Sequence, residues 1–139
     1  MKKLAPVYPF AAWDGTVAAL EEVIEKTGAS WSVDDVREAL ETGSAIMFAP
    51  YDEEGGDSLN DGFVILRGTE DPDGTRVLLV WIAWSKSGSA VVDYWQDIKE
   101  IARTGAFQQI EFRSPRPGWQ EIARRMGMRP VTTIYRGDA

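Results

Sequence analysis

The sequence predicts an α/β protein with a mixed sheet of about six strands, in the order β-α-α-β-β-β-α-β-α-β, with helices on both faces. Three observations lead to this class. Two segments with helical spacing of apolar residues precede a block of short apolar runs. Two of those runs flank a Pro/Gly turn, which predicts an antiparallel hairpin. The later part alternates helix and strand, which predicts right-handed crossovers between parallel strands.

The chain begins with a predicted edge strand and a helix. Residues 3–9 form a short strand, which Pro6 and Pro9 confine to an edge of the sheet because proline cannot donate to the ladder. Residues 14–28 form a helix that ends at Gly28, a residue that favours the left-handed conformation of a helix end. The apolar residues that the helix places on one face are Val17, Leu20, Val23 and Ile24.

A second helix and a strand follow. Ser32 and Asp35 have the spacing of a capping box, in which each side chain binds the other's backbone N–H. The helix over 32–43 therefore starts at Ser32 and ends at Gly43. Residues 44–51 form the strand that returns the chain to the sheet.

The middle of the sheet is a predicted hairpin. Strands over 62–68 and 76–84 are joined by the turn 69–75, which contains Pro and Gly. Both strands are almost continuously apolar, so we expect both faces of the sheet to be covered there. The polar and acidic segment 51–62 forms a loop before the hairpin.

The last part of the chain is predicted to hold two crossovers. A helix over 89–105 leads to a strand over 107–114, and a short helix over 115–127 leads to a final strand over 129–137. The first of these helices has one wide apolar stripe, made by Val91, Val92, Trp95, Ile98, Ile101 and Ala102.

Composition excludes several kinds of chemistry. The 139 residues suit one domain, 1–139, and they include no cysteine and no histidine. A thiol nucleophile, a thiolate metal site and a Ser-His arrangement are therefore excluded. The net charge of -7 argues against broad nucleic-acid binding, which needs clustered cations. We expect no membrane span and no signal peptide, because no apolar run is long enough, and a cytoplasmic or virion location fits.

The element order and the segment 118–137 resemble the GNAT N-acetyltransferase superfamily. That segment contains a short helix, a basic pair, a Met-Gly-Met turn and a strand that begins Arg-Pro-Val. Within the superfamily, the chain resembles in particular the compact GNAT-like proteins encoded by bacteriophages. The resemblance implies transfer of an acetyl group from acetyl-coenzyme A to an amine.

The junction between residues 84 and 90 carries the predicted cofactor site. Small residues at a helix start let backbone N–H groups approach a phosphate. In the superfamily this loop has the pattern Gln/Arg-x-x-Gly-x-Gly/Ala, which Gly88 and Ala90 match and from which Ser85 departs. An ordinary Ser/Gly turn with Ser87 or Ser89 as N-cap is the alternative. The predicted cofactor-binding residues are Trp84, Ser85, Lys86, Ser87, Gly88, Ser89, Ala90 and, after the next strand, Ser114.

The tryptophans of the strand before this loop have two interpretations. Trp81 and Trp84 are three residues apart, so an unbroken strand would point them to opposite faces. A bulge, which the superfamily often has here, would change that and free amides for a thioester carbonyl. The alternative is that both indoles pack in the core, as we expect of Trp13, Trp31, Trp95 and Trp119.

The predicted catalytic residues are Tyr135 and Glu111, which could move protons during acyl transfer. Each also has a structural interpretation, since Glu111 could pair with Arg113 on the same strand face and Tyr135 could pack as a half-buried strand residue. Tyr94 is a further ambiguous acid. The superfamily often places a tyrosine where this chain has Ala123, so its usual acid is absent.

Three functions stay open from the sequence. One is the acetyltransferase, with an acyl-coenzyme A and an amine acceptor as partners. Another is a non-catalytic bacteriophage virion or accessory protein of the same fold, acting through contacts with a virion or host protein. The third is an adaptor domain that binds a host partner through its acidic face. Many superfamily members continue into a seventh strand that flanks the acceptor site, and this sequence ends before it. We therefore expect either that a second subunit completes the cleft or that there is no acceptor site to complete.

Overall fold

The computed structural model describes residues 2–57, 59–114 and 118–139, and its centre is a mixed sheet in the order β1-β2-β4-β5-β6. All neighbouring pairs are antiparallel except β5 and β6, which are parallel. A two-residue strand, β3, pairs only with the end of β2. The strands are β1 (Lys3–Pro6), β2 (Ile46–Asp52), β3 (Gly56–Asp57), β4 (Gly62–Glu70), β5 (Arg76–Ser85) and β6 (Gln109–Phe112).

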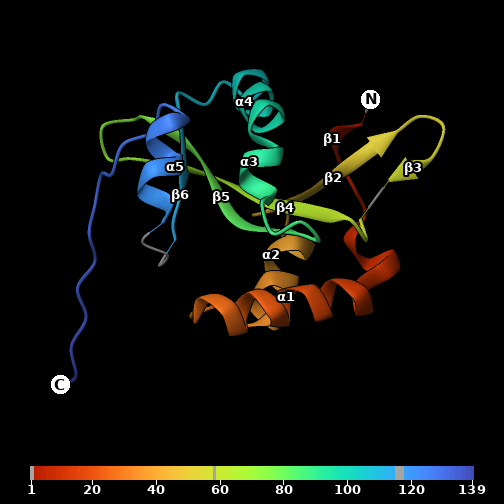
Figure 1. Ribbon diagram of the computed structural model, residues 1–139, viewed down its shortest axis with the longest axis horizontal. Coiled ribbons are helices and arrows are strands. Elements are labelled where there is room, and N and C mark those ends of the chain that lie inside the picture. The colour runs from red at the N-terminus through yellow and green to blue at the C-terminus, as the bar shows by residue number, and fades with distance from the viewer. Residues whose placement is uncertain (1, 58, 115–117) are drawn as a thin grey trace.

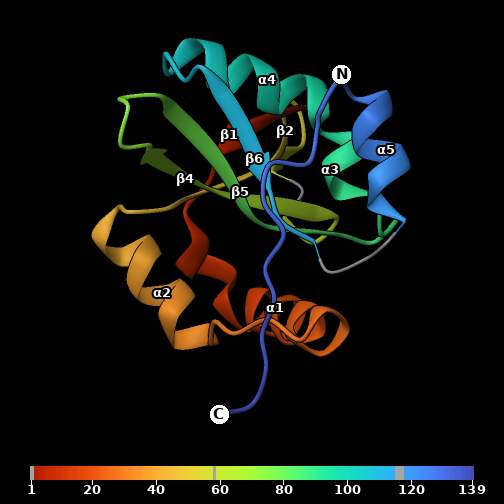
Figure 2. The same cartoon turned by 90° about the vertical axis from the view of Figure 1, so that its left-hand side faces the viewer.

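Helices cover both faces of the sheet, as predicted (Figure 1). On one side lie the 3₁₀ helix η1 (Pro9–Ala12), α1 (Trp13–Thr27) and α2 (Val33–Thr42), and on the other α3 (Ala90–Asp93) and α4 (Trp95–Thr104). Figure 2 shows α5 (Trp119–Arg125) on the same side as α3 and α4. None of the helices in the described ranges combines the length and apolar content that a bilayer crossing needs.

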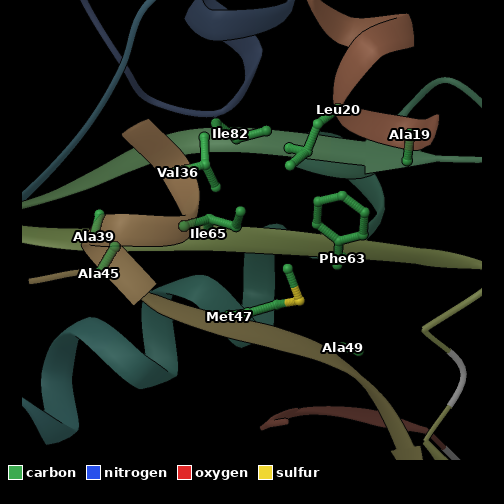
Figure 3. Close-up of a cluster of buried hydrophobic side chains, with 10 residues drawn as sticks. All are labelled: Ala19, Leu20, Val36, Ala39, Ala45, Met47, Ala49, Phe63, Ile65 and Ile82. Atoms are coloured by element: carbon green, nitrogen blue, oxygen red, sulfur yellow. The ribbon is translucent and has the colours of Figure 1, made fainter. Parts of the chain in front are cut away.

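The core has two layers, one on each side of the sheet. The layer beneath α1 and α2 is drawn in Figure 3 and consists of Ala19, Leu20, Val36, Ala39, Ala45, Met47, Ala49, Phe63, Ile65 and Ile82. The layer beneath α3 and α4 consists of Val64, Leu66, Leu78, Val80, Val91, Ile98 and Ala102. Alternate residues of β4 enter opposite layers, which is why its sequence is continuously apolar.

Local signals set the helix ends. The Ser32 hydroxyl accepts from the Asp35 N–H at 3.1 Å, and an Asp35 oxygen accepts from the Ser32 N–H at 2.8 Å, so the predicted capping box is confirmed. Gly28 ends α1 at φ 64°, a left-handed conformation that favours glycine. The buried face of α1 is rotated from the predicted stripe: Thr16 and Ala19 are buried beside Leu20, and small side chains there let the helix approach the sheet.

One predicted element is wrong and another is interrupted. The final strand over 129–137 does not form, because no neighbouring strand lies beside this segment among the described residues and β-propensity alone supplies no hydrogen-bond partner. The helix predicted over 89–105 is interrupted at Tyr94, which separates α3 from α4 with φ -102° and ψ 8°. The helix predicted over 115–127 begins at Trp119, and its predicted start, 115–117, lies outside the described residues.

Candidate functional site

Pairing between β5 and β6 stops halfway along β5. The paired residues run from Val77 with Gln109 to Val80 with Phe112, whereas β5 continues to Ser85. Residues 81–85 therefore have no strand partner on the β6 side among the described residues. We call this place the wedge. It lies between residues 81–85 of β5 and the end of β6 at Phe112.

A β-bulge at Trp81 lies where the wedge opens. On β4, the neighbours Ile65 and Leu66 pair with Ile82 and Val80, so Trp81 is an extra residue on β5. A bulge bends its strand and disrupts the local ladder. The pairing of β5 with β6 ends at Val80 and Phe112, one residue before the bulge, so the ladder between these two strands does not use the backbone groups of residues 81–85.

The bulge also brings both tryptophan side chains of β5 to one face. Trp81 and Trp84 pack against the core layer beneath α1 and α2, so the packing interpretation describes them. The Trp84 indole N–H donates to Glu22 Oε2 at 3.1 Å, and its ring lies 5.6 Å from that of Phe63. The hydrogen bond from Lys26, and then the one from Trp84, lower the pKa of Glu22. Trp84 can contribute to the wedge through its backbone.

In the loop after β5, some backbone N–H groups donate hydrogen bonds and others have no partner among the described residues. The N–H of Lys86 donates to Asp61 O at 3.0 Å, that of Gly88 to Ser85 O at 3.1 Å, and that of Ser89 to Ser87 Oγ at 3.2 Å. Four other amides, which begin within the loop and continue into the first turn of α3, have no hydrogen-bond partner in the described parts of the chain. They belong to Ser87, Ala90, Val91 and Val92.

A chain of hydroxyl groups joins this loop to a carboxylate. The Ser87 hydroxyl donates to Asp93 Oδ2 at 2.9 Å and lies 3.0 Å from Ser85 Oγ. Because a hydroxyl has one proton, Ser87 must accept from Ser85. The negative charge of Asp93 thus lies next to the free amides, while the cation of Lys86 is 3.5 Å from a carboxylate oxygen of Asp61. Ser89 is the N-cap of α3 but makes no side-chain capping bond.

Glu111 lies on β6, half-buried, directly opposite Leu79 of β5. Arg113 donates to one of its oxygens, Oε2, through Nε at 2.9 Å and through Nη2 at 2.8 Å. Its other oxygen, Oε1, has no hydrogen-bond partner among the described residues. Glu111 therefore combines the predicted ion pair with one carboxylate oxygen that can still accept a proton.

The other two predicted site residues lie apart from this group. Tyr135 is 89% exposed in the C-terminal segment, because the strand that should have placed it does not form. Ser114 is exposed two residues beyond the end of β6, and its side chain or backbone has an interaction partner. The structure thus brings Glu111 close to β5 but leaves Tyr135 outside the folded body.

Two further aromatic contacts near the bulge were not predicted. The Arg67 guanidinium lies 4.6 Å from the Trp81 ring centroid, and the Trp31 ring lies 6.2 Å from it. Arg67 pairs with Leu79 across β4 and β5, so Arg67, Leu79 and Glu111 form a row across three strands. These contacts depend on pairing between distant segments, and no local sequence pattern could have shown them.

Tyr94 is the side chain that links the helix break to the start of β4. A β-carbon added to Gly62 would lie 2.6 Å from the Tyr94 hydroxyl and 3.0 Å from the backbone oxygen of Trp84, so a larger residue there would force these groups to shift. Burial, followed by the charges of Asp93 and Asp61, raises the pKa of Tyr94. The phenol therefore stays protonated in the folded protein to a higher pH than in the unfolded chain.

This shift predicts a pH-dependent stability. Since the folded-state pKa of Tyr94 is above the ordinary value of 10.0, its stabilising contribution is complete below that pH and is lost as pH rises through the folded-state pKa. We expect the free energy of unfolding, measured by urea denaturation, to fall above pH 10 more steeply for the natural protein than for Tyr94→Phe. Identical slopes for the two proteins would contradict the assignment.

A cavity of about 500 Å³ lies away from the wedge, between α4 and strands β1, β2 and β4. It is lined mainly by apolar side chains, among them Phe48, Leu66 and Ile101. It does not contain the loop amides or Glu111. Within the described ranges, no group of three His, Cys, Asp or Glu residues could hold a metal ion.

Comparison with known proteins gives the fold. No protein-family model matches the sequence, and no curated protein matches it. Solved structures do match, at 12% identity or below in the three described next. An acetyltransferase of Trypanosoma brucei superposes with a TM-score of 0.68, at 12% identity over 100% of both chains.

Two other matches are a ribosomal-protein-alanine N-acetyltransferase from Brucella melitensis, with a TM-score of 0.69 and 12% identity over 99% of both chains, and a glucosamine-6-phosphate N-acetyltransferase from Arabidopsis thaliana. The latter has a TM-score of 0.66 and 7% identity over 99% of this chain and 98% of that one. The chain therefore has the fold of GNAT acetyltransferases, as the resemblance implied. These matches do not bear on a bacteriophage origin, which stays a prediction.

Proposed function

We propose that this protein transfers an acetyl group from acetyl-coenzyme A to an amine. The observation that supports this most is the wedge, where a bulge at Trp81 ends the pairing of β5 with β6 in a fold shared with acetyltransferases. Backbone groups of residues 81–85 are not paired with β6 and are available to a thioester held between the two strands. The wedge does not identify which amine accepts the acetyl group.

The loop after β5 offers donors for the pyrophosphate of the coenzyme. The unpaired amides of Ser87, Ala90, Val91 and Val92 are four such donors. The carboxylate of Asp93 opposes an anion at the same place. These backbone N–H donors suit a pyrophosphate, and the negative charge of Asp93 weakens its binding.

The chemistry of transfer falls to few groups in this chain. Acetyl-coenzyme A supplies an acyl group already activated as a thioester. Backbone N–H groups of residues 81–85 on the side of the wedge would hold the carbonyl oxygen of the thioester. Glu111 would accept the amine proton at Oε1 while Arg113 holds Oε2. As the new C–N bond forms, the C–S bond breaks, and coenzyme A would leave as a thiolate that takes up this proton. Tyr135 of the same chain takes no part in this chemistry.

Removing the opposing charge should strengthen cofactor binding. We expect Asp93→Asn to bind acetyl-coenzyme A roughly 2- to 10-fold more tightly than the natural protein, with a larger gain at low salt. Calorimetric titration at two ionic strengths measures this. Asp34→Asn, in the first turn of α2, removes the same charge far from the loop and should leave affinity unchanged. If Asp93→Asn binds acetyl-coenzyme A with the same Kd as the natural protein, the loop after β5 is not part of the binding site.

Thermal shift and calorimetry with acetyl-coenzyme A test the proposal as a whole. A ligand that binds only the folded state must raise the melting temperature. Ser89→Glu adds a negative charge at an exposed loop residue and should weaken binding at least tenfold, whereas Ser30→Glu in the α1–α2 loop should not. A melting temperature unmoved by millimolar acetyl-coenzyme A would refute the proposal.

A second candidate function is a non-catalytic protein of this fold, which the sequence resemblance places among bacteriophage virion or accessory proteins. The engaged amides of Lys86, Gly88 and Ser89 and the nearby charge of Asp93 favour it. Its signature is a failure to bind the coenzyme together with stable association with another protein. The same calorimetric titration separates the two functions.

A further inference from the structure

The orientation of Glu111 fixes the face of the sheet from which an acceptor amine would approach. Its neighbours on β6, Ile110 and Phe112, pack against the core layer beneath α3 and α4. Successive side chains of a strand point to opposite faces, so Glu111 points to the face on which α1 and α2 lie. An amine that gives its proton to Glu111 therefore lies on that face.

Arg67 is a cation on the same face, two strands away from Glu111. Its guanidinium lies over Trp81, whose ring packs against the core layer beneath α1 and α2. Arg67 pairs with Leu79 on β5, and Leu79 pairs with Glu111 on β6. Because neighbouring strands are about 4.8 Å apart, the Cα atoms of Arg67 and Glu111 are separated by about 10 Å. A cation and a carboxylate thus lie on either side of an apolar residue.

The guanidinium of Arg67 has no anionic partner in the part of the chain that the structure describes. It is half-buried, and it makes neither an ion pair nor a hydrogen bond with any described residue. The other two arginines that lie over aromatic rings there, Arg37 and Arg76, use their N–H groups in hydrogen bonds. The planar fork of N–H donors on Arg67 is therefore available to a carboxylate of a ligand.

The surroundings of Arg67 favour an acid group that is attached to an apolar body. Arg67 and Arg113 outnumber Glu111 along this row, although the whole chain has a net charge of -7. Beside Arg67, the half-buried rings of Trp81 and Trp31 lie 6.2 Å apart and form an apolar wall. One guanidinium matches the single charge of a carboxylate, whereas a phosphate monoester carries nearly two charges.

We propose that the acceptor is an amine that also carries a carboxylate, and that Arg67 binds this carboxylate while the amine lies at Glu111. The inference rests on the proposed function, because the role of Glu111 places the amine. The separation of Arg67 from Glu111 favours an amino acid whose two charged groups stand at opposite ends of a short apolar chain. The C–N bond forms, the C–S bond breaks, and the amine proton passes through Glu111 to the thiolate of coenzyme A.

Calorimetric titration of the protein without coenzyme tests the carboxylate site by itself. We expect δ-aminovalerate to bind about tenfold more tightly than its alcohol analogue, in which a hydroxymethyl group replaces the carboxylate. Arg67→Gln should abolish this preference. Arg37→Gln, which removes a guanidinium that lies over Phe10 instead, should retain it. Glycine, whose amine and carboxylate are too close together to reach both groups, should gain nothing from Arg67.

Acetylation kinetics test whether this site serves the reaction. The natural protein should show the same preference of about tenfold in kcat/KM, and Arg67→Gln should lose it mainly through a higher KM. A higher KM is expected because Arg67 does not touch the reacting atoms.

The outcomes separate this inference from the proposed function. Equal affinity for the two compounds in the natural protein, or binding of neither, would overturn the inference and leave acetyl transfer intact. A preference that Arg67→Gln retains would also overturn it. Selective binding through Arg67 in a protein that does not bind acetyl-coenzyme A would refute the proposed function and keep the carboxylate site. The comparison of the two compounds on the natural protein needs no variant, so it decides the question even if Arg67→Gln does not fold.

Discussion

Replacing Glu111 by glutamine is expected to lower kcat/KM for acetyl transfer by about 10²–10³-fold, because the amide cannot accept the amine proton. The Kd for acetyl-coenzyme A should not change, since Glu111 lies on β6 and not in the loop after β5. The loss should shrink at high pH, where the amine deprotonates without help. Steady-state kinetics over a pH series and calorimetry measure both quantities.

Arg113→Gln is the matched control for this prediction. It removes both contacts to Glu111 Oε2 but keeps the carboxylate, so we expect a far smaller loss of rate than in Glu111→Gln. If Glu111→Gln retains the natural rate, or if its only defect is weaker coenzyme binding, the role of Glu111 as base is wrong. The proposal that the wedge binds an acyl group would then need another proton acceptor.

Replacing Phe63 by alanine is expected to lower the free energy of unfolding by about 3–5 kcal/mol. Phe63 is 1% exposed, and its ring lies 5.6 Å from that of Trp84, so the substitution leaves a cavity between β4 and the end of β5. Natural domains have only about 5–15 kcal/mol in total, so this loss is large. Urea denaturation followed by circular dichroism measures it.

Ile46→Ala is the control for the core prediction. Ile46 is also an apolar strand residue, but it is 50% exposed on β2, and we expect a loss below about 1 kcal/mol. Phe63→Ala should in addition shift the tryptophan emission to longer wavelength, because water gains access to Trp84. A loss in Phe63→Ala no larger than that in Ile46→Ala would contradict the described core.

Much of the fold could be predicted because its signals are local. The capping box of Ser32 and Asp35 and the glycine at the end of α1 act within a few residues of chain. The failure over 129–137 has the opposite cause. Its residues favour a strand, but a strand forms only beside another strand, and no strand lies beside this segment among the described residues.

The candidate site was predictable only in part. The loop pattern at Gly88 and Ala90 indicated where a helix starts after a strand, which the structure has. It could not show that Asp93 reaches back to Ser87, or that Tyr94 interrupts the helix and packs against Gly62. Such contacts depend on how the loop closes onto the start of β4.

The sequence by itself determined the helices α1 and α2, the hairpin of β4 and β5 and the crossover to β6, because periodicity, caps and turns act over short stretches of chain. Only the tertiary structure decided that β5 bulges at Trp81 and that its pairing with β6 ends at Val80 and Phe112. Those features depend on the register between segments far apart in sequence. Register results from packing both faces of the sheet at once, which no single stretch of residues encodes.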